Sequence, residues 1–203
     1  MKVLALDLAT SMGVAVGIAG RPPKTSTVHL GKGGEEARFS RLLTVVAKLL
    51  AEHQPDLVAI EAAVGGPKTS HYLVGLSACA RGVCFNRGVR VELCNIATVR
   101  RHFLGKHLTM KHFPGKNAAA AKKAIKAQVI ARCGLLGWHV ESDDEADAAA
   151  TFSFASSTWG NAQAAPLGGL FSGACADGSD DPRKEAPDVR VATRAGLNRN
   201  PLS

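Results

Sequence analysis

Two short apolar segments that each end in a carboxylate constrain the fold of this chain more than any other feature. The first covers residues 3–8, where Asp7 follows four apolar residues, and the second is Leu57-Val-Ala-Ile60 followed by Glu61. Short apolar runs beside turn-forming residues are typical of buried strands. A carboxylate in such a strand is costly to bury unless it is paired or bound to a metal. Ligands gather at the carboxyl ends of parallel strands, so two acids there favour a shared site, although Asp7 alone is equally well explained as a turn cap.

The remaining pattern predicts a mixed sheet covered by helices. Thr10-Ser11 and Gly13 predict a tight turn after the first strand. Further strands are expected at 14–19, 25–30 and 89–94, and helices at 35–53, 70–86, 98–104, 117–133 and from Ser142 onward. Three strands joined by short turns make an antiparallel meander, to which the later helices and strands add. The fold class is therefore α/β, with a five-stranded mixed sheet flanked by helices.

The chain is expected to hold one folded domain and a tail. Residues 1–159 carry the periodic pattern, whereas 160–203 contain six Gly and four Pro among 44 residues and few large apolar side chains. Such composition is typical of a flexible extension without its own core.

Cysteine usage and the amino terminus indicate a cytoplasmic protein. The five cysteines are odd in number and lack the C-x-x-C pairing of a zinc site, so reduced thiols are expected; they are Cys79, Cys84, Cys94, Cys133 and Cys175. Asp7 interrupts the first apolar run after four residues, so neither a signal peptide nor a membrane span is expected.

The positive charge of the chain is concentrated in one stretch. The net charge is +8, yet no acidic residue lies between Glu92 and Glu141. That stretch holds nine basic residues: Arg100, Arg101, Lys106, Lys111, Lys116, Lys122, Lys123, Lys126 and Arg132. A concentrated basic segment favours a polyanionic partner. The alternative is a solvated, lysine-rich helix face.

A third group of acids lies near the end of the patterned region. Ser142 and Glu145 have the spacing of a capping box, and acids in a first helical turn are stabilised by the helix dipole. Neither effect explains Asp147, which shares a helix face with Asp144; Asp143 is the fallback if the helix register differs by one. The alanines that flank these acids would let the helix approach the sheet closely.

Four carboxylates from distant parts of the chain predict a metal site. Asp7, Glu61, Asp144 and Asp147 would repel one another unless cations neutralise them. Mg²⁺ prefers such hard oxygen ligands and keeps waters for substrate contacts. Two ions about 3.5–4 Å apart activate water and stabilise the leaving oxygen in phosphodiester hydrolysis. Acids for metals beside a basic segment for phosphates are typical of a nuclease.

Several motifs of this sequence resemble those of the RuvC-type Holliday junction resolvases, in the same order, over roughly residues 1–157. Those motifs are Leu4-Ala-Leu-Asp7-Leu-Ala-Thr-Ser-Met-Gly13, Ala59-Ile60-Glu61, Gly75-Leu-Ser-Ala-Cys-Ala-Arg81-Gly82, Lys126-Ala-Gln-Val129 and Asp144-Glu-Ala-Asp147-Ala-Ala. The resemblance implies a ribonuclease H-like domain, two Mg²⁺ or Mn²⁺ ions, a homodimer and paired incisions in four-way DNA junctions. Divergent members occur in phages and prophages, which is the origin it suggests.

The resemblance and the charge pattern together assign roles to the basic residues. Lys126, with Lys122 and Lys123, is expected nearest the scissile phosphate. Further from this phosphate, five basic residues are expected to contact the nucleic-acid backbone: Arg100, Arg101, Lys106, Lys111 and Lys116. Tyr72 is a weak candidate for an aromatic wedge at the junction centre. The recurring His102, His107 and His112 do not share a helix face and are expected to be solvated.

Two other functions fit parts of the pattern. Asp7-Leu-Ala-Thr-Ser-Met-Gly13 also resembles the phosphate loop of the actin, sugar-kinase and Hsp70 superfamily, which requires a second such domain. A ribonuclease H-like protein that binds nucleic acid without cutting it would have the same basic segment. The enzyme interpretation fails if the fold separates Asp7, Glu61 and Asp147 or buries them against lysines.

Overall fold

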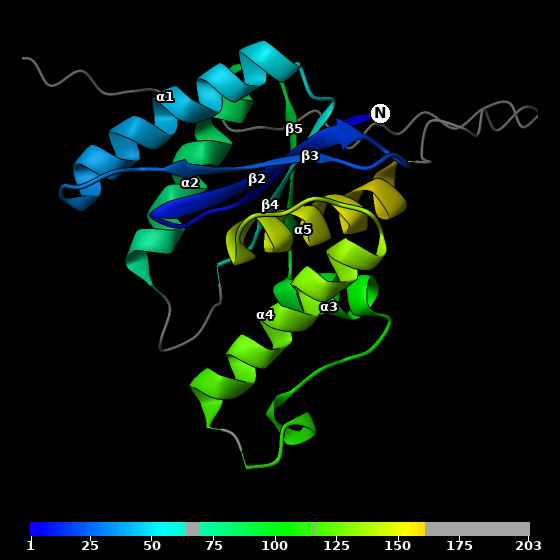
Figure 1. Ribbon diagram of the computed structural model, residues 1–203. Helices are drawn as coiled ribbons and strands as arrows, with labels where there is room; N and C mark the ends of the chain where they lie inside the picture. The colour runs from blue at the N-terminus through cyan, green and yellow to red at the C-terminus, as the bar shows by residue number, and fades with distance from the viewer. Residues whose placement is uncertain (64–69, 116, 161–203) are drawn as a thin grey trace, which may run out of the picture. The chain divides into compact units, whose positions relative to one another are not determined.

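The computed structural model describes residues 1–63, 70–115 and 117–160, which form a five-stranded sheet with helices on both faces (Figure 1). The strands are β1 (Lys2–Asp7), β2 (Ser11–Ile18), β3 (Lys24–His29), β4 (Leu57–Glu61) and β5 (Arg90–Cys94). Their order in the sheet is β3-β2-β1-β4-β5. Strands β1, β2 and β3 pair antiparallel, while β4 pairs parallel with both β1 and β5. The predicted mixed sheet is confirmed.

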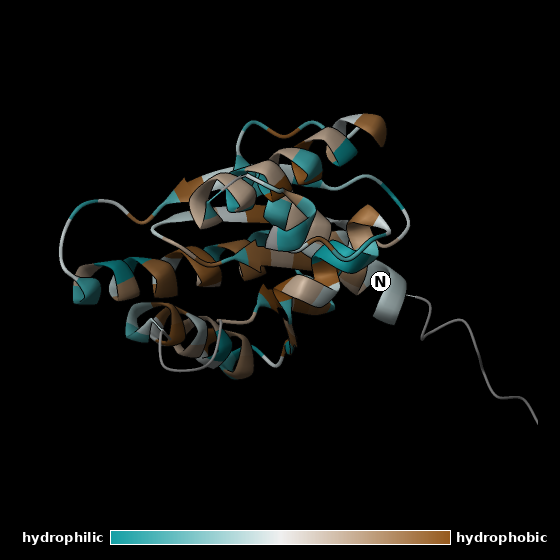
Figure 2. Cartoon of the chain, turned by 90° about the horizontal axis from the view of Figure 1, so that it is seen from below, coloured by the Kyte–Doolittle hydropathy of each residue, from teal (hydrophilic) through white to brown (hydrophobic). Residues whose placement is uncertain are grey.

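The two-residue period of the strands divides the core into two layers. In β1, Leu4 and Leu6 face one side of the sheet, and Val3 and Ala5 face the other. The first side is covered by α1 (Glu35–His53) and α2 (His71–Asn86), the second by α3 (Ile96–Leu104), α4 (Ala118–Leu135) and α5 (Asp143–Trp159). Figure 2 shows hydrophobic and hydrophilic residues alternating along these helices, as expected for elements with one buried face.

Helix α5 packs directly on the sheet, as its alanines predicted. The side chains between them are small: Ala5 and Ala59 in the strands, and Ala146 and Ala149 in the helix, are all buried. Close approach also explains Gly13, because a Cβ atom there would fall on the backbone carbonyl of Asp144.

The expected tight turn at Thr10-Ser11 and Gly13 is wrong in its position. Ser11 and Gly13 both belong to β2, and Gly13 lies opposite Asp7 in the antiparallel ladder. The connection spans only the residues between Asp7 and Ser11. Gly13 is therefore required by the helix above it rather than by a turn.

Smaller differences concern the basic stretch. Helix α3 begins at Ile96, two residues before the predicted start, because the Asn95 side chain accepts hydrogen bonds from Ala97 N and Thr98 N. A short 3-10 helix, Met110–His112, interrupts the expected loop. Asn117 caps α4 through Ala120 N.

Within the described residues, no helix combines the length and the apolar character needed to cross a bilayer. Cys84, Cys94 and Cys133 are buried free thiols, Cys79 is half-buried, and Cys175 lies outside the described residues. Burial raises the pKa of Cys84, Cys94 and Cys133 to about 11, so these thiols are unreactive near neutral pH. The predicted tail, 160–203, lies outside the described residues beyond Gly160, and its boundary stays a prediction.

Candidate active site

Side chains alternate between the two faces along β1 and β4, which places Asp7 and Glu61 on the same face of the sheet, at the carboxyl ends of these strands. Asp7 continues the series Val3, Ala5 on the face covered by α5, and Glu61 continues Leu57 and Ala59 on that same face. Strands β1 and β4 are parallel neighbours, with Val3 opposite Leu57 and Ala5 opposite Ala59. The same register, extended by two residues, sets Asp7 beside Glu61 at the carboxyl ends of the strands.

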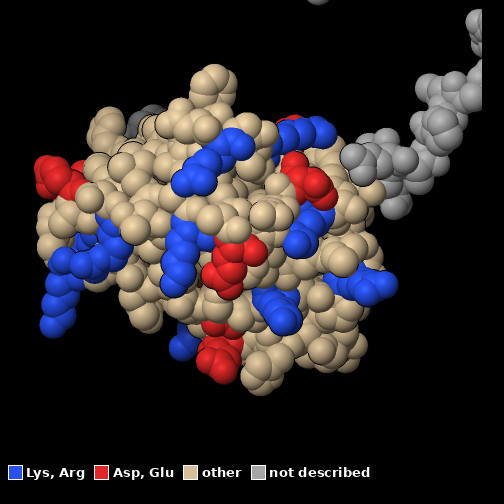
Figure 3. All heavy atoms as spheres, turned by 90° about the horizontal axis from the view of Figure 1, so that it is seen from above, with Lys and Arg blue, Asp and Glu red and all other residues tan. Residues whose placement is uncertain are grey.

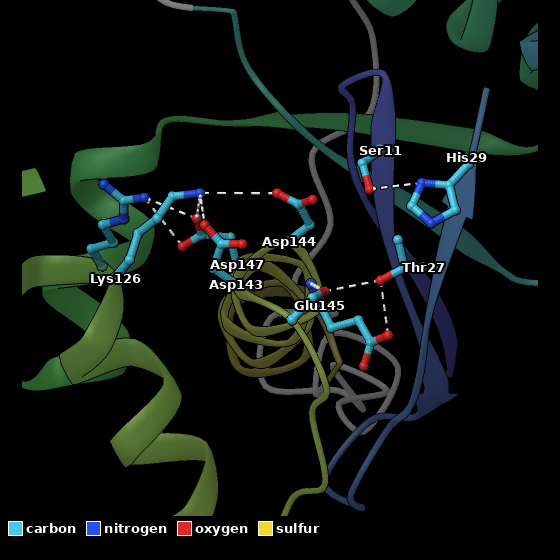
Figure 4. A network of polar contacts seen from close by, with 10 residues as sticks. Ser11, Thr27, His29, Lys126, Asp143, Asp144, Glu145 and Asp147 are labelled. Atoms are coloured by element: carbon cyan, nitrogen blue, oxygen red, sulfur yellow. Dashed lines mark hydrogen bonds and ion pairs between the residues drawn. The ribbon is translucent and has the colours of Figure 1, made fainter. Parts of the chain in front are cut away.

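The start of α5 supplies the other two carboxylates, Asp144 from its first turn and Asp147 from just beyond it. Ser142 caps the helix by accepting a hydrogen bond from Glu145 N at 3.1 Å. Asp144 and Asp147 follow on one side of the helix, and Figure 4 shows both turned toward Lys126 of α4. The Asp147 side chain is only 3% exposed. The predicted i, i+3 pair of acids therefore faces the sheet edge.

All four predicted acids line one pocket of about 290 Å³. Its charged lining residues are Asp7, Glu61, Arg100, Lys122, Lys126, Asp144 and Asp147. Asp143, the fallback ligand, is instead half-exposed at the outer edge, where it accepts a hydrogen bond from Lys126 Nζ at 2.6 Å. The geometry thus favours Asp144 over Asp143 as the member of the site.

The acids perturb one another strongly. Burial, followed by repulsion from Asp147 and Asp144, raises the pKa of Asp7 to about 7. Burial, followed by repulsion from Asp7 and Asp147, raises the pKa of Glu61 to about 8. Burial, followed by repulsion from Asp143, also raises the pKa of Asp144. Like charges brought together in a dry site make the ionised state costly, which is the condition that a bound cation relieves.

Two basic side chains enter the same pocket. Arg100 of α3 donates from Nη2 to both carboxylate oxygens of Asp147, at 3.0 and 3.2 Å. Lys126 Nζ lies 3.7 Å from Asp147 and 3.9 Å from Asp144. Burial lowers the pKa of Lys126, but the hydrogen bond to Asp143 and the neighbouring acids outweigh it, so the net shift is upward. Lys126, expected nearest the scissile phosphate, lies beside the acids, and Arg100, expected further out, lies just as deep.

The helical period of α3 could have identified Arg100 as a residue on the inward face of the helix. Val99 and Phe103 of α3 are buried in the core, and Ile96 lines the acidic pocket. Arg100 is four residues after Ile96 and three before Phe103, so it belongs to the inward face of α3. Its neighbour Arg101 is exposed.

The donor set suits a hard divalent cation, although the carboxylates are not arranged around one. Among residues 1–63, 70–115 and 117–160, no group of three or more acidic, histidine or cysteine side chains has the arrangement of a metal site. Arg100 and Lys126, rather than a cation, neutralise the negative charge of Asp147. Glu61 Oε2, however, is buried without a hydrogen-bond partner among the described residues. A buried carboxylate oxygen without a donor, beside acids with raised pKa values, fits a cation ligand.

Apart from Lys122, the other described basic residues of the acid-free stretch do not line the pocket. The exposed ones are Arg101, Lys106, Lys111, Lys122, Lys123 and Arg132, of which Lys122 also lines the pocket. Lys116 lies outside the described residues. By contrast, Figure 3 shows lysines and arginines interspersed with acids on the side of α1. The acid-free run of basic residues lies on α3, on α4 and in the segment between them.

His102, His107, His112 and Tyr72 do not line the acidic pocket. His102 and His112 make hydrogen bonds with Ser157 and with Thr109, respectively, and His107 is exposed. Tyr72 is half-buried, stacks on Phe39 and makes a hydrogen bond of 3.3 Å with Thr10.

Comparisons with known proteins agree with this architecture. A scan against protein-family models found no match, and a search of curated protein sequences found none. Solved structures do match. The structure of Thermus thermophilus RuvC aligns with 80% of this chain and 96% of its own, at 18% identity and a TM-score of 0.55. The T. thermophilus RuvC complex with a Holliday junction substrate has the same coverage, at 17% identity and a TM-score of 0.58. The chain therefore has the ribonuclease H-like fold of RuvC.

Proposed function

We propose that this protein is a metal-dependent endonuclease that hydrolyses phosphodiester bonds in branched DNA, with the four-way Holliday junction as its main substrate. The observation that carries the proposal is the convergence of Asp7, Glu61, Asp144 and Asp147 on one pocket. The fold that presents this pocket is shared with a protein solved in complex with a Holliday junction substrate.

The four carboxylates would hold two Mg²⁺ ions, for which Mn²⁺ can substitute. When bound, the ions supply an activated water and neutralise charge on the phosphate oxygens. The protein contributes the arrangement of the ligands. The carboxyl ends of β1 and β4 fix Asp7 and Glu61, and the capped start of α5 fixes Asp144 and Asp147.

Lys126 and Arg100 are the cations positioned to contact the phosphate that is cut. Lys126 is 23% exposed and Arg100 is 19% exposed, so both reach the pocket while their stems stay buried. Each now pairs with carboxylates that the proposal assigns to metal. A phosphate in the pocket offers both side chains alternative acceptor oxygens, and the arginine fork binds phosphate in two-pronged geometry.

The exposed basic residues of α3 and α4 would hold the DNA backbone on either side of this phosphate. Lys122 and Lys123 are closest to the pocket, and Arg101, Lys106 and Lys111 lie further out. Lys116 is assigned the same role from the sequence alone. Phosphate contacts of this kind give affinity that falls steeply with salt.

A homodimer is part of the proposal, because paired cuts in a four-way junction need two sites. Helix α2 carries exposed apolar side chains on the side away from the sheet. Val74 is 45% exposed and Phe85 is 85% exposed, with Gly82 between them near the same face. Exposed large apolar side chains on one helix face are typical of an interface with a partner. A second copy of the chain is the partner that the junction's symmetry favours.

The alternative is a protein that binds branched nucleic acid without cutting it. One observation favours it: Asp147 is ion-paired with Arg100 and lies within 3.7 Å of Lys126, so part of the acidic charge is already neutralised. Both alternatives predict salt-dependent binding to DNA, and only cleavage separates them.

The test uses labelled four-way, flap and linear DNA, each incubated in Mg²⁺ or in EDTA with wild-type protein and with Asp7→Asn. We expect cutting of the four-way junction in Mg²⁺ alone, and a rate at least about 100-fold lower for Asp7→Asn with unchanged DNA binding. Binding without cleavage by the wild type would favour the non-cleaving alternative. Unchanged cleavage by Asp7→Asn would remove Asp7 from the site.

A further inference from the structure

The first turn of α5 holds a second buried carboxylate that takes no part in the acidic pocket. Glu145 stands between Asp144 and Asp147 in sequence and is only 5% exposed. Successive helix residues are rotated by about 100°, so Glu145 leaves the helix on another side. Figure 4 shows it directed toward β3, while Asp144 and Asp147 point toward Lys126.

Neutral hydrogen-bond donors surround this carboxylate. Thr27 donates to Oε1 at 2.9 Å, and Thr25 donates to Oε2 at 3.1 Å. The backbone N–H of Glu141 donates to Oε2 at 3.0 Å. The described residues give Glu145 no ion pair with lysine or arginine. Its burial is therefore compensated by donors from β3 and from the segment before α5.

The same contacts tie the start of the helix to an edge strand. Ser142, the N-cap, makes a hydrogen bond of 2.9 Å with Thr27. The Thr25 hydroxyl shares its one proton between Glu145 Oε2 and the backbone carbonyl of His139, which lies 2.8 Å from Oγ1. The arrangement differs from the predicted capping box, because the Glu145 side chain reaches Glu141 N and β3 rather than closing back on Ser142 N.

We propose that Glu145 is a positioning residue for the candidate metal ligands. Its bonds to Thr25 and Thr27 fix the rotation and height of the first turn of α5 against β3. That rotation decides whether Asp144 and Asp147 face the carboxyl ends of β1 and β4. The inference rests on the proposed function, since it concerns ligands for the metal that this function requires. Groups that orient metal ligands typically change metal affinity about 10- to 100-fold when removed.

The test measures Mn²⁺ binding by calorimetry, without DNA, on wild type, Glu145→Gln and Thr27→Val. Glutamine keeps the size of Glu145 but accepts with one oxygen only, and valine keeps the shape of Thr27 but cannot donate. We expect affinity for Mn²⁺ to fall about tenfold in Glu145→Gln and less in Thr27→Val. On four-way DNA, kcat should fall in both while KM stays near the wild-type value, because the basic surface is unchanged.

The matched control is Val46→Ala, which removes buried side-chain volume in α1, on the opposite face of the sheet. This variant should lose stability yet keep its Mn²⁺ affinity within about twofold of wild type. If Glu145→Gln or, should that variant fail to fold, Thr27→Val also keeps wild-type affinity, Glu145 only stabilises the fold and the inference is overturned.

A second readout needs no metal, and it separates this inference from the proposed function. Hydrogen exchange at the amides of Ala146 and Asp147 should speed up in Glu145→Gln but not in Val46→Ala. Absence of Mn²⁺ binding by the wild type itself would instead overturn the proposed function. Unchanged exchange in Glu145→Gln would show that Glu145 does not hold the helix start.

Discussion

Glu145 and Glu61 both have buried carboxylate oxygens and lie on opposite sides of the start of α5. The hydrogen bonding of the two carboxylates differs. Glu145 receives three hydrogen bonds from neutral donors. Glu61 Oε2 has no donor in the described part of the chain, and burial together with Asp7 and Asp147 raises the pKa of Glu61 to about 8. A satisfied carboxylate supports the fold, whereas an unsatisfied one among other acids costs stability. This difference fits a structural role for Glu145 and the proposed role of metal ligand for Glu61.

The largest effect expected from this contrast is a loss of stability at high pH in metal-free protein. The raised pKa values of Asp7 and Glu61, about 7 and about 8, mean that folding favours their protonated forms. The stability they contribute is full below pH ~4, where the unfolded carboxyls are also protonated, and is lost as pH rises through 7 to 8. At about 1.4 kcal/mol per pKa unit, the loss amounts to several kcal/mol. Urea denaturation in EDTA between pH 4 and pH 9 measures it.

Addition of Mg²⁺ should reverse this loss, because the ion stabilises the ionised carboxylates. The rise in Tm on adding Mg²⁺ should be largest near pH 8 and small near pH 5. A stability that stays level from pH 5 to pH 9 in EDTA would show that the acids are not strained in the metal-free protein.

Glu61→Gln and Glu145→Gln should change the free energy of unfolding in opposite directions. In EDTA at pH 9, Glu61→Gln removes an uncompensated charge and should raise the free energy of unfolding by about 1–3 kcal/mol. Glu145→Gln breaks satisfied hydrogen bonds and should lower it by about 1–3 kcal/mol. At pH 5 the Glu61 effect should nearly vanish, because the carboxyl is then protonated. Chemical denaturation at both pH values checks this, and equal signs at pH 9 would remove the contrast between the two residues.

A comparable effect is expected from Gly13→Ala, which disturbs the acidic side without changing an acidic side chain. Its Cβ atom would fall on the Asp144 carbonyl, so the first turn of α5 must shift. Overpacking of this kind typically costs about 1–3 kcal/mol. Gly134→Ala in α4 is the matched control, since no described atom lies within 4 Å of its new Cβ, and it should be neutral or stabilising by up to about 1 kcal/mol. Thermal unfolding of both variants distinguishes them, and equal Tm values would contradict the close packing.

The sequence predicted the fold closely because its apolar patterns are local. The run from Val3 to Leu6 and the run from Leu57 to Ile60 read as buried strands, and the acids at their ends both line the candidate site. The i, i+3 spacing of Asp144 and Asp147 was also sufficient to place both on one side of α5. These features depend only on strand and helix periods.

Other features depend on contacts between distant segments. The role of Glu145 follows from Thr25 and Thr27, which come from an edge strand more than 110 residues earlier in the chain. Gly13 has the composition of a turn, and only the position of α5 shows why it must be glycine. Arg100 differs from Arg101 only by the direction of its side chain, which requires the buried face of α3 to be known.

The central claim is that Asp7, Glu61, Asp144 and Asp147 trap divalent cations in one pocket. A crystal structure of the protein grown in Mn²⁺, with anomalous scattering to locate the ions, tests it most directly. The account predicts Mn²⁺ bound by these four carboxylates, with Arg100 and Lys126 turned away from Asp147. A pocket without Mn²⁺, with Arg100 still hydrogen-bonded to Asp147, would contradict it.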